Sequence, residues 1–195
     1  MAAETTKSAA AGDDAIGVVA LHSFSSEELA WRAGQGCRAS FTELVRRYAP
    51  RLSAFLCRRT RDRHEVEDLV QDTFLRVYEN IERYDRSWRF STWLFTIAAR
   101  TAISHHRRRR PTCAALDVPV GACDAAAERR EERENLWSLA AELPERQYQA
   151  LRLKYNEDMS IEEIARVMGK SQVCIKVLLY RARTALARRL TETHP

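Results

Sequence analysis

Glycine and proline are scarce in this chain, and long apolar runs are absent. The 195 residues include 6 Gly and 5 Pro, while 45% are hydrophobic. A chain with few helix-breaking residues and enough apolar ones to fill a core is typical of an all-helical protein. No stretch is long and apolar enough to cross a membrane, and no basic-then-apolar signal peptide opens the sequence. We therefore expect an all-α protein of the cytoplasm, without membrane insertion.

Motifs for metal binding, disulfides and covalent catalysis are also missing. The five cysteines are scattered and odd in number, and none forms a CxxC pair, which argues against a disulfide framework or a zinc finger. There is no Ser-His-Asp or Cys-His pattern and no glycine-rich phosphate loop. His105 and His106 are adjacent, so their side chains diverge on a helix. The sequence predicts no enzymatic activity, no cofactor and no metal site.

Two stretches lack acidic residues altogether. From Arg86 to Arg110 there are seven arginines and no acid, and from Lys170 to Arg189 there are six lysines or arginines and no acid. Between His64 and Asp85, in contrast, seven acids face two arginines. The net charge of +5 is therefore strongly segregated along the chain.

Residues 160–189 have the pattern of a helix-turn-helix. Ser160 and Glu163 have the spacing of a capping box, Gly169 ends the first helix, and Ser171 caps the second. The second helix buries an apolar stripe and presents an opposite face of amide and cationic donors that suit DNA bases and phosphates. That face contains Gln172, Lys176, Tyr180 and Arg183. The alternative is an ordinary solvated basic helix.

The basic stretch before Arg110 is interleaved with aromatic residues. Aromatic rings beside cations are suited to unstacked bases and their phosphates. Trp88 and Phe90 precede a helix capped by Ser91 or Thr92, and we expect this pair to be exposed. At least one of Trp93 and Phe95 is expected in the core.

The other helices follow from apolar periodicity and caps. We expect helices after Ser25, after a second capping box at Ser40 and Glu43 with a kink at Pro50, over residues 64–83, over residues 129–142, and after Pro144. On composition alone, the acidic face of the helix at 64–83 is an ordinary solvated surface. Tail 1–24 is expected to be disordered, and 111–127 to be a flexible linker between helical domains at 25–110 and 128–195.

From about Glu27 to Leu190, the chain resembles the bacterial RNA polymerase sigma factors of the extracytoplasmic-function (ECF) group. Three motifs in this order carry the resemblance: HEVEDLVQDTFLRVYENIERYD, FSTWLFTIAARTAISHHRRRR and LPERQYQALRLKYNEDMSIEEIARVMGKSQVCIKVLLYRARTAL. It implies a sigma-2-like and a sigma-4-like domain, a sigma factor that binds core polymerase at the clamp helices and the flap, and promoter DNA as a second partner. It also implies an anti-sigma partner and association with the nucleoid when polymerase is bound.

The resemblance assigns a role to each surface. It overturns the solvated-face interpretation of the acidic helix, whose polymerase-binding residues would be Asp68, Gln71, Asp72 and Arg76. The aromatic and basic segment would read and open the −10 element and hold a flipped base, through Trp88, Phe90, Ser91, Trp93, Arg100, Arg107 and Arg108 within the run to Arg110. The helix-turn-helix would read the −35 element as duplex through Ser171, Gln172, Lys176, Arg181 and Arg183.

The chain departs from the family pattern at three positions. Arg100, Ser104 and Cys174 stand where relatives usually have Asn, Asp and Thr. Arginine cannot accept a hydrogen bond, so the −10 preference of relatives does not transfer directly. The loss of the Thr hydroxyl at Cys174 removes a phosphate donor.

Two other functions fit parts of the sequence. A free-standing helix-turn-helix regulator would bind operators as a dimer without polymerase. A protein that binds RNA or single strands without sequence preference would use only the segment from Arg86 to Arg110. Neither requires Asp68, Gln71 and Asp72 together.

Overall fold

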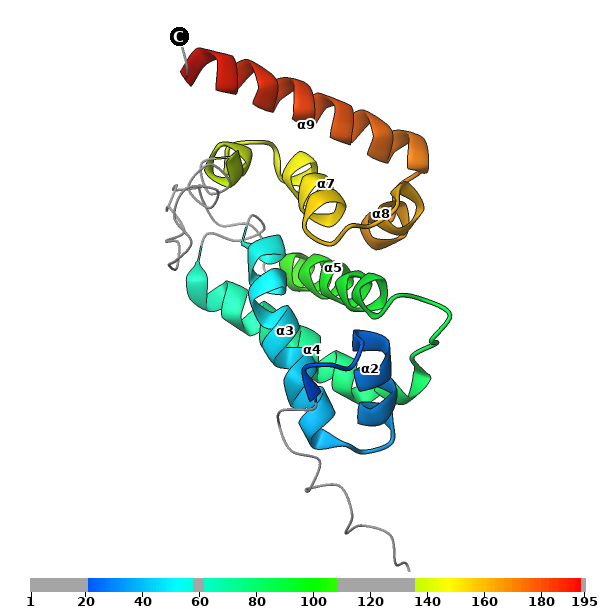
Figure 1. The fold of residues 1–195 in the computed structure, drawn as a ribbon. Coiled ribbons are helices and arrows are strands. Elements are labelled where there is room, and N and C mark those ends of the chain that lie inside the picture. The colour runs from blue at the N-terminus through cyan, green and yellow to red at the C-terminus, as the bar shows by residue number, and fades with distance from the viewer. Residues whose placement is uncertain (1–20, 58–61, 109–135, 194–195) are drawn as a thin grey trace, which may run out of the picture.

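The computed structural model describes residues 21–57, 62–108 and 136–193, and within these it contains helices and no strand. The all-α prediction is confirmed. Figure 1 shows the arrangement of the helices, which are α2 (Ser26–Gly34), α3 (Arg38–Leu56), α4 (Arg63–Asn80), a 3-10 turn (Ile81–Arg83), α5 (Phe90–Arg108), α7 (Glu145–Tyr155), α8 (Ile161–Met168) and α9 (Gln172–Thr193). Residues 136–141 are also helical.

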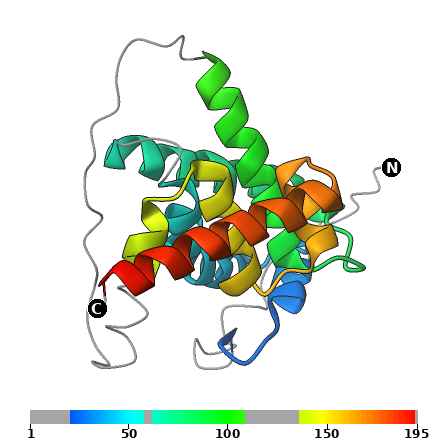
Figure 2. The same ribbon diagram turned by 90° about the horizontal axis from the view of Figure 1, so that it is seen from above.

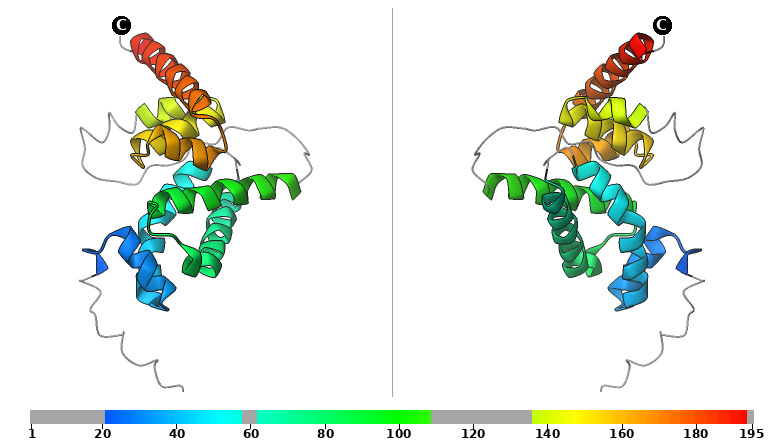
Figure 3. Two further views of the ribbon diagram at one scale, coloured as in Figure 1. Left: turned by 90° about the vertical axis from the view of Figure 1, so that its right-hand side faces the viewer. Right: turned by 90° about the vertical axis from the view of Figure 1, so that its left-hand side faces the viewer.

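The helices form two stacked groups. Helices α2 to α5 make the N-terminal group, and α7 to α9 make the C-terminal group, which lies on α5 through α8 (Figures 1 and 3). Helix α9 packs on α7 and α8 at the far side from α5, and Figure 2 shows it crossing the top of the molecule. The second helix of the helix-turn-helix therefore faces outward.

The apolar stripes expected from the sequence form most of the core. Leu44, Leu52, Phe55 and Leu56 of α3 are at most 1% exposed, and Ile175 and Ala182 of α9 are fully buried. Three residues that fit the apolar periodicity of their helices are nevertheless exposed, because they lie at the edge of the apolar stripes: Tyr78, Leu136 and Tyr155. Tyr78 still packs edge-on against Phe41, with ring centroids 5.0 Å apart.

Helix α3 begins differently from the prediction. Cys37 is its N-cap, without a side-chain cap bond, and Ser40 and Glu43 lie inside the helix and are buried. The capping box at Ser40 is therefore wrong: Ser40 donates to Cys37 Sγ, and Glu43 accepts from Arg46 and Arg47. Pro50 lies inside α3, which continues through it.

The caps of the helix-turn-helix are confirmed. Ser160 Oγ accepts from the Glu163 amide, and the Glu163 carboxylate accepts from the Ser160 amide at 2.8 Å. Gly169 has φ +61°, a left-handed conformation that favours glycine. Ser171 Oγ accepts from the Cys174 amide, and Ser25 caps α2 in the same way. Of the tail 1–24 that was expected to be disordered, residues 21–24 are described and are held by Arg47, which donates to the carbonyls of Leu21, His22 and Phe24. Residues 1–20, the expected linker at 111–127, and the side chains of Arg107 and Arg108 lie outside the described residues.

Candidate polymerase and nucleic-acid surfaces

The outer face of α4 presents the predicted acidic surface. Asp68, Gln71, Asp72 and Arg76 are all exposed, on the side of α4 opposite the buried Leu69, Val70 and Val77. Leu75, at i+3 from Asp72, is 61% exposed on the same face. The sequence interpretation missed Leu75, although its position outside the apolar stripe of α4 was the available signal. An apolar side chain among exposed carboxylates is a combination suited to docking another protein.

The segment before α5 contains one exposed and one buried aromatic side chain. Trp88 is 43% exposed, but Phe90 is fully buried, with its ring 5.4 Å from that of Tyr48 and 5.6 Å from that of Tyr84. The expectation that both are exposed is right for Trp88 and wrong for Phe90. Helix α5 starts at Phe90 rather than after it, and the Phe90 ring therefore points into the core.

Ser91 and Trp93 are less accessible than expected. Ser91 is 4% exposed, and Trp93 is partly buried, with its ring 5.3 Å from that of Tyr84. Phe95 is 1% exposed and is a core residue. Arg100 is exposed on α5. Trp88 and Arg100 are therefore the predicted −10 residues that the described structure leaves accessible, with part of Trp93.

Hydrogen bonds fix the loop at residues 85–89 on both sides. Tyr84 Oη donates to the Trp88 carbonyl, and Glu27 of α2 accepts from the Phe90 amide at 3.0 Å. Burial, followed by the charge of Glu27, raises the pKa of Tyr84 well above its ordinary value, so the phenol stays protonated as a donor. The Asp85 carboxylate accepts from the Ser87 amide. The loop that presents Trp88 is therefore preorganised.

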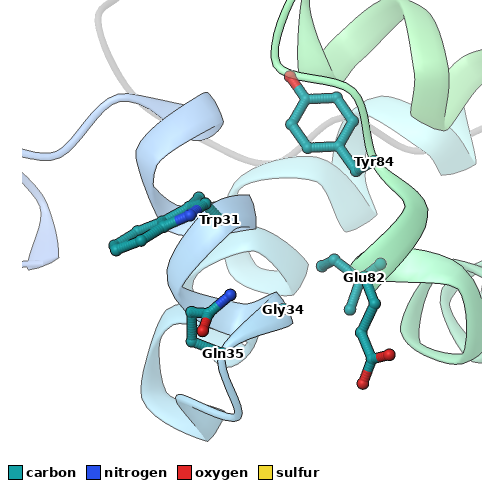
Figure 4. Close-up of a pocket in the computed structure, with 6 residues that line it drawn as sticks. Trp31, Gly34, Gln35, Glu82 and Tyr84 are labelled. Atoms are coloured by element: carbon teal, nitrogen blue, oxygen red, sulfur yellow. The ribbon is translucent and has the colours of Figure 1, made fainter.

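A hollow of about 210 Å³ adjoins this loop. Figure 4 shows that Trp31 of α2 and Gln35, the residue after α2, form one wall, and Glu82 and Tyr84 form the other. Arg86 lies over Trp31, with its guanidinium carbon 5.5 Å from the ring centroid. The walls thus offer an aromatic face, an amide and a carboxylate, groups that stack on a base and hydrogen-bond to its edge.

Helix α9 presents the predicted basic face to solvent. Ser171, Gln172, Lys176, Arg181 and Arg183 are all exposed, and Arg183 Nε donates to the Leu179 carbonyl. An apolar ridge accompanies them: Val173, Val177 and Tyr180, at i, i+4 and i+7, are 70%, 42% and 65% exposed. The two valines were missed, although their spacing in the sequence already placed them off the buried stripe.

The two helical groups touch through polar contacts at the base of α8. Arg51 of α3 makes two bonds to Glu157, at 3.0 and 2.6 Å, and Arg89 donates to the Asp158 carbonyl at 2.9 Å. Thr92 of α5 donates to Glu163 at 2.7 Å. We call these bonds, together with the packing of α8 on α5, the intergroup contact.

Burial affects the two carboxylates of the intergroup contact differently. It raises the pKa of Glu157, which is 3% exposed, against the opposing effect of Arg51. Burial also acts to raise the pKa of Glu163, but hydrogen bonds from Ser160 and Thr92 outweigh it and hold that pKa below its ordinary value. Glu163 therefore caps α8 and binds the N-terminal group with one carboxylate.

The described residues hold no group of three His, Cys, Asp or Glu side chains suited to a metal ion. In the same part of the chain, no helix combines the length and apolarity that a membrane span requires. An exposed acidic and apolar face, a basic aromatic loop and an outward helix-turn-helix define a helical DNA-binding protein with a separate protein-docking surface.

Comparisons with known proteins identify the family. Residues 44–112 match the model of Sigma-70 region 2, and residues 133–186 match that of Sigma-70, region 4. The ECF RNA polymerase sigma factor SigM of Bacillus subtilis (strain 168) is 32% identical over 74% of this chain and 91% of its own length. The chain belongs to the ECF RNA polymerase sigma factors.

Two solved structures share the fold. CnrH, in complex with the cytosolic domain of CnrY, is 25% identical with a TM-score of 0.59, covering 86% of this chain and 97% of that one. RpoE of Bartonella quintana, in complex with the anti-sigma factor NepR, is 23% identical with a TM-score of 0.62, covering 77% of this chain and 96% of that one.

The chain is therefore a sigma factor, and this family consists of transcription regulators rather than catalysts. It acts with core RNA polymerase and promoter DNA and directs promoter-specific initiation. Among the described residues, the N-terminal group contains most of region 2, and the C-terminal group contains most of region 4.

Proposed function

We propose that the three exposed surfaces divide the work of promoter recognition. The α4 face binds the clamp helices of the polymerase largest subunit, the loop at 85–89 with α5 reads and opens the −10 element, and α9 reads the −35 element as duplex. The observation that carries this proposal is the fixed loop that holds Trp88, which follows Tyr84 and the hollow that Tyr84 and Trp31 line.

The −10 step rests on stacking. An exposed Trp88 ring offers a face to one unstacked base, and the hollow offers Gln35 and Glu82 as hydrogen-bonding partners for the edge of a flipped base. Because the loop is already fixed by Tyr84 and Glu27, little ordering entropy is lost on binding. Phe90 and Ser91 support the loop and α5 from inside, while Arg100 lies on the exposed surface of α5.

The −35 step rests on the outer face of α9. Gln172 and Lys176 supply hydrogen-bond donors for base edges, and Arg181 and Arg183 supply charge for phosphates. Val173 and Val177 lie beside Gln172 and Lys176 and offer methyl groups to the C5-methyl of thymine. The outward position of α9 leaves this face open for a major groove.

The polymerase step rests on the acidic and apolar face of α4. Asp68 and Asp72 provide charge complementarity to basic residues, and Leu75 provides apolar area at the centre.

We place the protein in the cytoplasm and, when bound to polymerase, on the nucleoid. Domains at 25–110 and 128–195 joined by 111–127 remain our proposed division. By analogy with the complexes of CnrH and RpoE, we also infer that an anti-sigma factor binds this chain.

Reconstituted transcription on a library of randomised promoters tests this proposal. Core polymerase with the wild-type chain should select two conserved elements from the library. Asp72→Arg should abolish selective transcription, whereas Glu142→Arg, an equal charge reversal at an exposed site of the C-terminal group, should retain it. Tight binding of selected duplexes by the chain alone, without association with core polymerase, would favour the operator-binding alternative.

A further inference from the structure

The intergroup contact uses the same N-terminal surface that the proposed −10 step requires. Arg166 of α8 lies over the Trp88 ring, with its guanidinium carbon 3.6 Å from the ring centroid. Arg89, the next residue, donates to the Asp158 carbonyl. The aromatic face that would stack on a base and the adjacent cation are therefore both engaged by the C-terminal group.

The chemistry of this contact imitates that of a nucleic-acid strand. Glu157 and Glu163 supply carboxylate oxygens to donors of the N-terminal group, Arg51 and Thr92, much as a strand supplies phosphate oxygens to cations. A planar cationic group covers Trp88 where a planar base would lie. One strand of DNA and the C-terminal group therefore cannot occupy this surface together.

The geometry is specific enough to favour one closed arrangement. Glu157 is 3% exposed and accepts hydrogen bonds from two nitrogens of the Arg51 guanidinium, Nε and Nη2. Thr92 is 2% exposed. Tyr148 Oη of α7 also donates to the Ala54 carbonyl of α3 at 3.1 Å. Asp158, whose carbonyl binds Arg89, has φ +51°, a conformation that non-glycine residues adopt rarely but Asp tolerates.

The closed arrangement leaves the other two surfaces uncovered. The α4 face remains exposed, and α9 lies on the far side of α7 and α8. The closed arrangement therefore covers the proposed −10 surface and leaves the proposed −35 surface of α9 exposed.

We propose that the intergroup contact is an intramolecular latch: the C-terminal group masks the −10 surface of the free chain, and single-stranded promoter DNA must displace it. This inference rests on the proposed role of the loop at 85–89. Since only the open fraction binds the strand, the apparent affinity for a −10 strand is reduced by that fraction.

A matched pair of double variants tests the latch. Arg51→Gln with Thr92→Val removes a guanidinium on α3 and a hydroxyl on α5 that bind the C-terminal group. The control, Arg46→Gln with Thr96→Val, removes the same groups from the same helices, but their partners, Glu43 and the Thr92 carbonyl, belong to the N-terminal group. Small-angle scattering measures the shape, and a fluorescent oligonucleotide carrying the non-template −10 strand of a library-selected promoter measures binding.

We expect the wild type and the control to scatter as compact particles and the latch variant to have a larger radius of gyration. The latch variant should bind the oligonucleotide about tenfold more tightly than the other two proteins. If its helical circular dichroism is reduced, the single variant Glu157→Gln replaces it in both measurements. This change weakens the same contact from the side of the C-terminal group, and the new side chain is of equal size. An extended wild type, or equal oligonucleotide affinities in all proteins, would overturn the latch.

The failure of the latch and that of the proposed function are distinguishable. Scattering requires neither polymerase nor promoter. A wild type that initiates selectively, but matches the latch variant in shape and strand affinity, contradicts the latch alone. If the latch variant is more extended than the wild type, but the wild type never initiates selectively with core polymerase, the proposed function is contradicted. The inhibitory role of the latch is then contradicted with it.

Discussion

At the residue scale, the two exposed valines of α9 determine what kind of base contact this helix can make. Val173 and Val177 carry no hydrogen-bonding group, so they can favour a base only through apolar contact. In the major groove, the apolar group available on a base is the thymine methyl. Their placement beside Gln172 and Lys176 therefore adds a methyl-reading element to a polar face.

Replacing thymine by deoxyuridine in the −35 element measures that contact. For the wild type with core polymerase, we expect removal of the contacted methyl to weaken promoter binding several-fold, by roughly 1 kcal/mol. Val177→Ala should weaken binding to the thymine promoter by a similar factor and become insensitive to the replacement. Equal sensitivity of both proteins would show that Val177 does not contact a thymine methyl, and replacements outside the −35 element serve as controls.

Leu75 provides a second prediction at the residue scale. Because its side chain is 61% exposed, Leu75→Asp should leave the melting temperature close to that of the wild type. If the α4 face docks on polymerase, the same change should weaken association with core polymerase about tenfold or more. Ile103→Asp, at 57% exposure on α5, is the matched control, and equal losses in the two variants would exclude a specific role for Leu75.

Single-residue exposure was also where sequence reasoning had least support. Trp88 and Phe90 have the same character and similar neighbours, and their directions differ because α5 already begins at Phe90, before the predicted caps Ser91 and Thr92. A shift of one residue in a helix start rotates a side chain by about 100°. Periodicity does not fix helix ends so closely, so Phe90 was placed on the wrong side.

At the element scale, the turn between α8 and α9 depends on one glycine. Gly169 has φ +61° and open space around its Cβ position, so Gly169→Ala meets conformational strain without a steric clash. We expect a loss of about 1 kcal/mol in the free energy of unfolding, measured with urea. Gly34→Ala is the control, because Gly34 lies inside α2 and an added Cβ there would make ordinary contacts, 3.5 Å at the nearest; a similar loss at both positions would contradict the argument.

The Glu43 cluster on α3 provides a pH prediction. The hydrogen bond from Arg46 contributes most to holding the pKa of Glu43 well below its ordinary 4.5, helped by those from Arg47 and His22 and opposed by burial. The folded chain therefore binds this proton less readily than the unfolded chain. The stabilisation from Glu43 is complete above about pH 4.5 and is lost as the pH falls toward the folded pKa.

Urea unfolding at several pH values checks this expectation. Between about pH 6 and about pH 3, the wild type should lose stability more steeply than Glu43→Gln, which has no charge to protonate. Glu162→Gln, at an exposed carboxylate, should follow the wild-type slope. Equal slopes in the wild type and Glu43→Gln would show that Glu43 does not cause the loss of stability at low pH.

Element prediction succeeded where a local signal and the fold agreed. The helix-turn-helix was predicted with its capping box, its left-handed glycine and the Ser171 cap, since all of these depend on neighbours within a few residues. The capping box at Ser40 failed because Glu43 is buried and pairs with Arg46 and Arg47, and burial is not encoded in the four-residue motif.

At the scale of the whole molecule, the segregated charge of the sequence becomes three separate surfaces. That division was predictable, because runs of one sign on a helix usually remain exposed. The intergroup contact was not predictable, since Arg51 and Glu157 are 106 positions apart and Thr92 and Glu163 are 71 apart. Neither pair has a local pattern that indicates its partner.

Permanganate footprinting of a library-selected promoter tests the central claim most directly, since it detects unpaired thymines. With core polymerase and the wild-type chain, we expect reactive thymines at the −10 element. Trp88→Ala should reduce this reactivity about fivefold or more, through loss of base stacking of roughly 1–3 kcal/mol, while retaining association with core polymerase. Asp72→Arg should abolish it by preventing that association. Strand opening of equal extent with Trp88→Ala and the wild type would contradict the assignment of the loop at 85–89 to the −10 element.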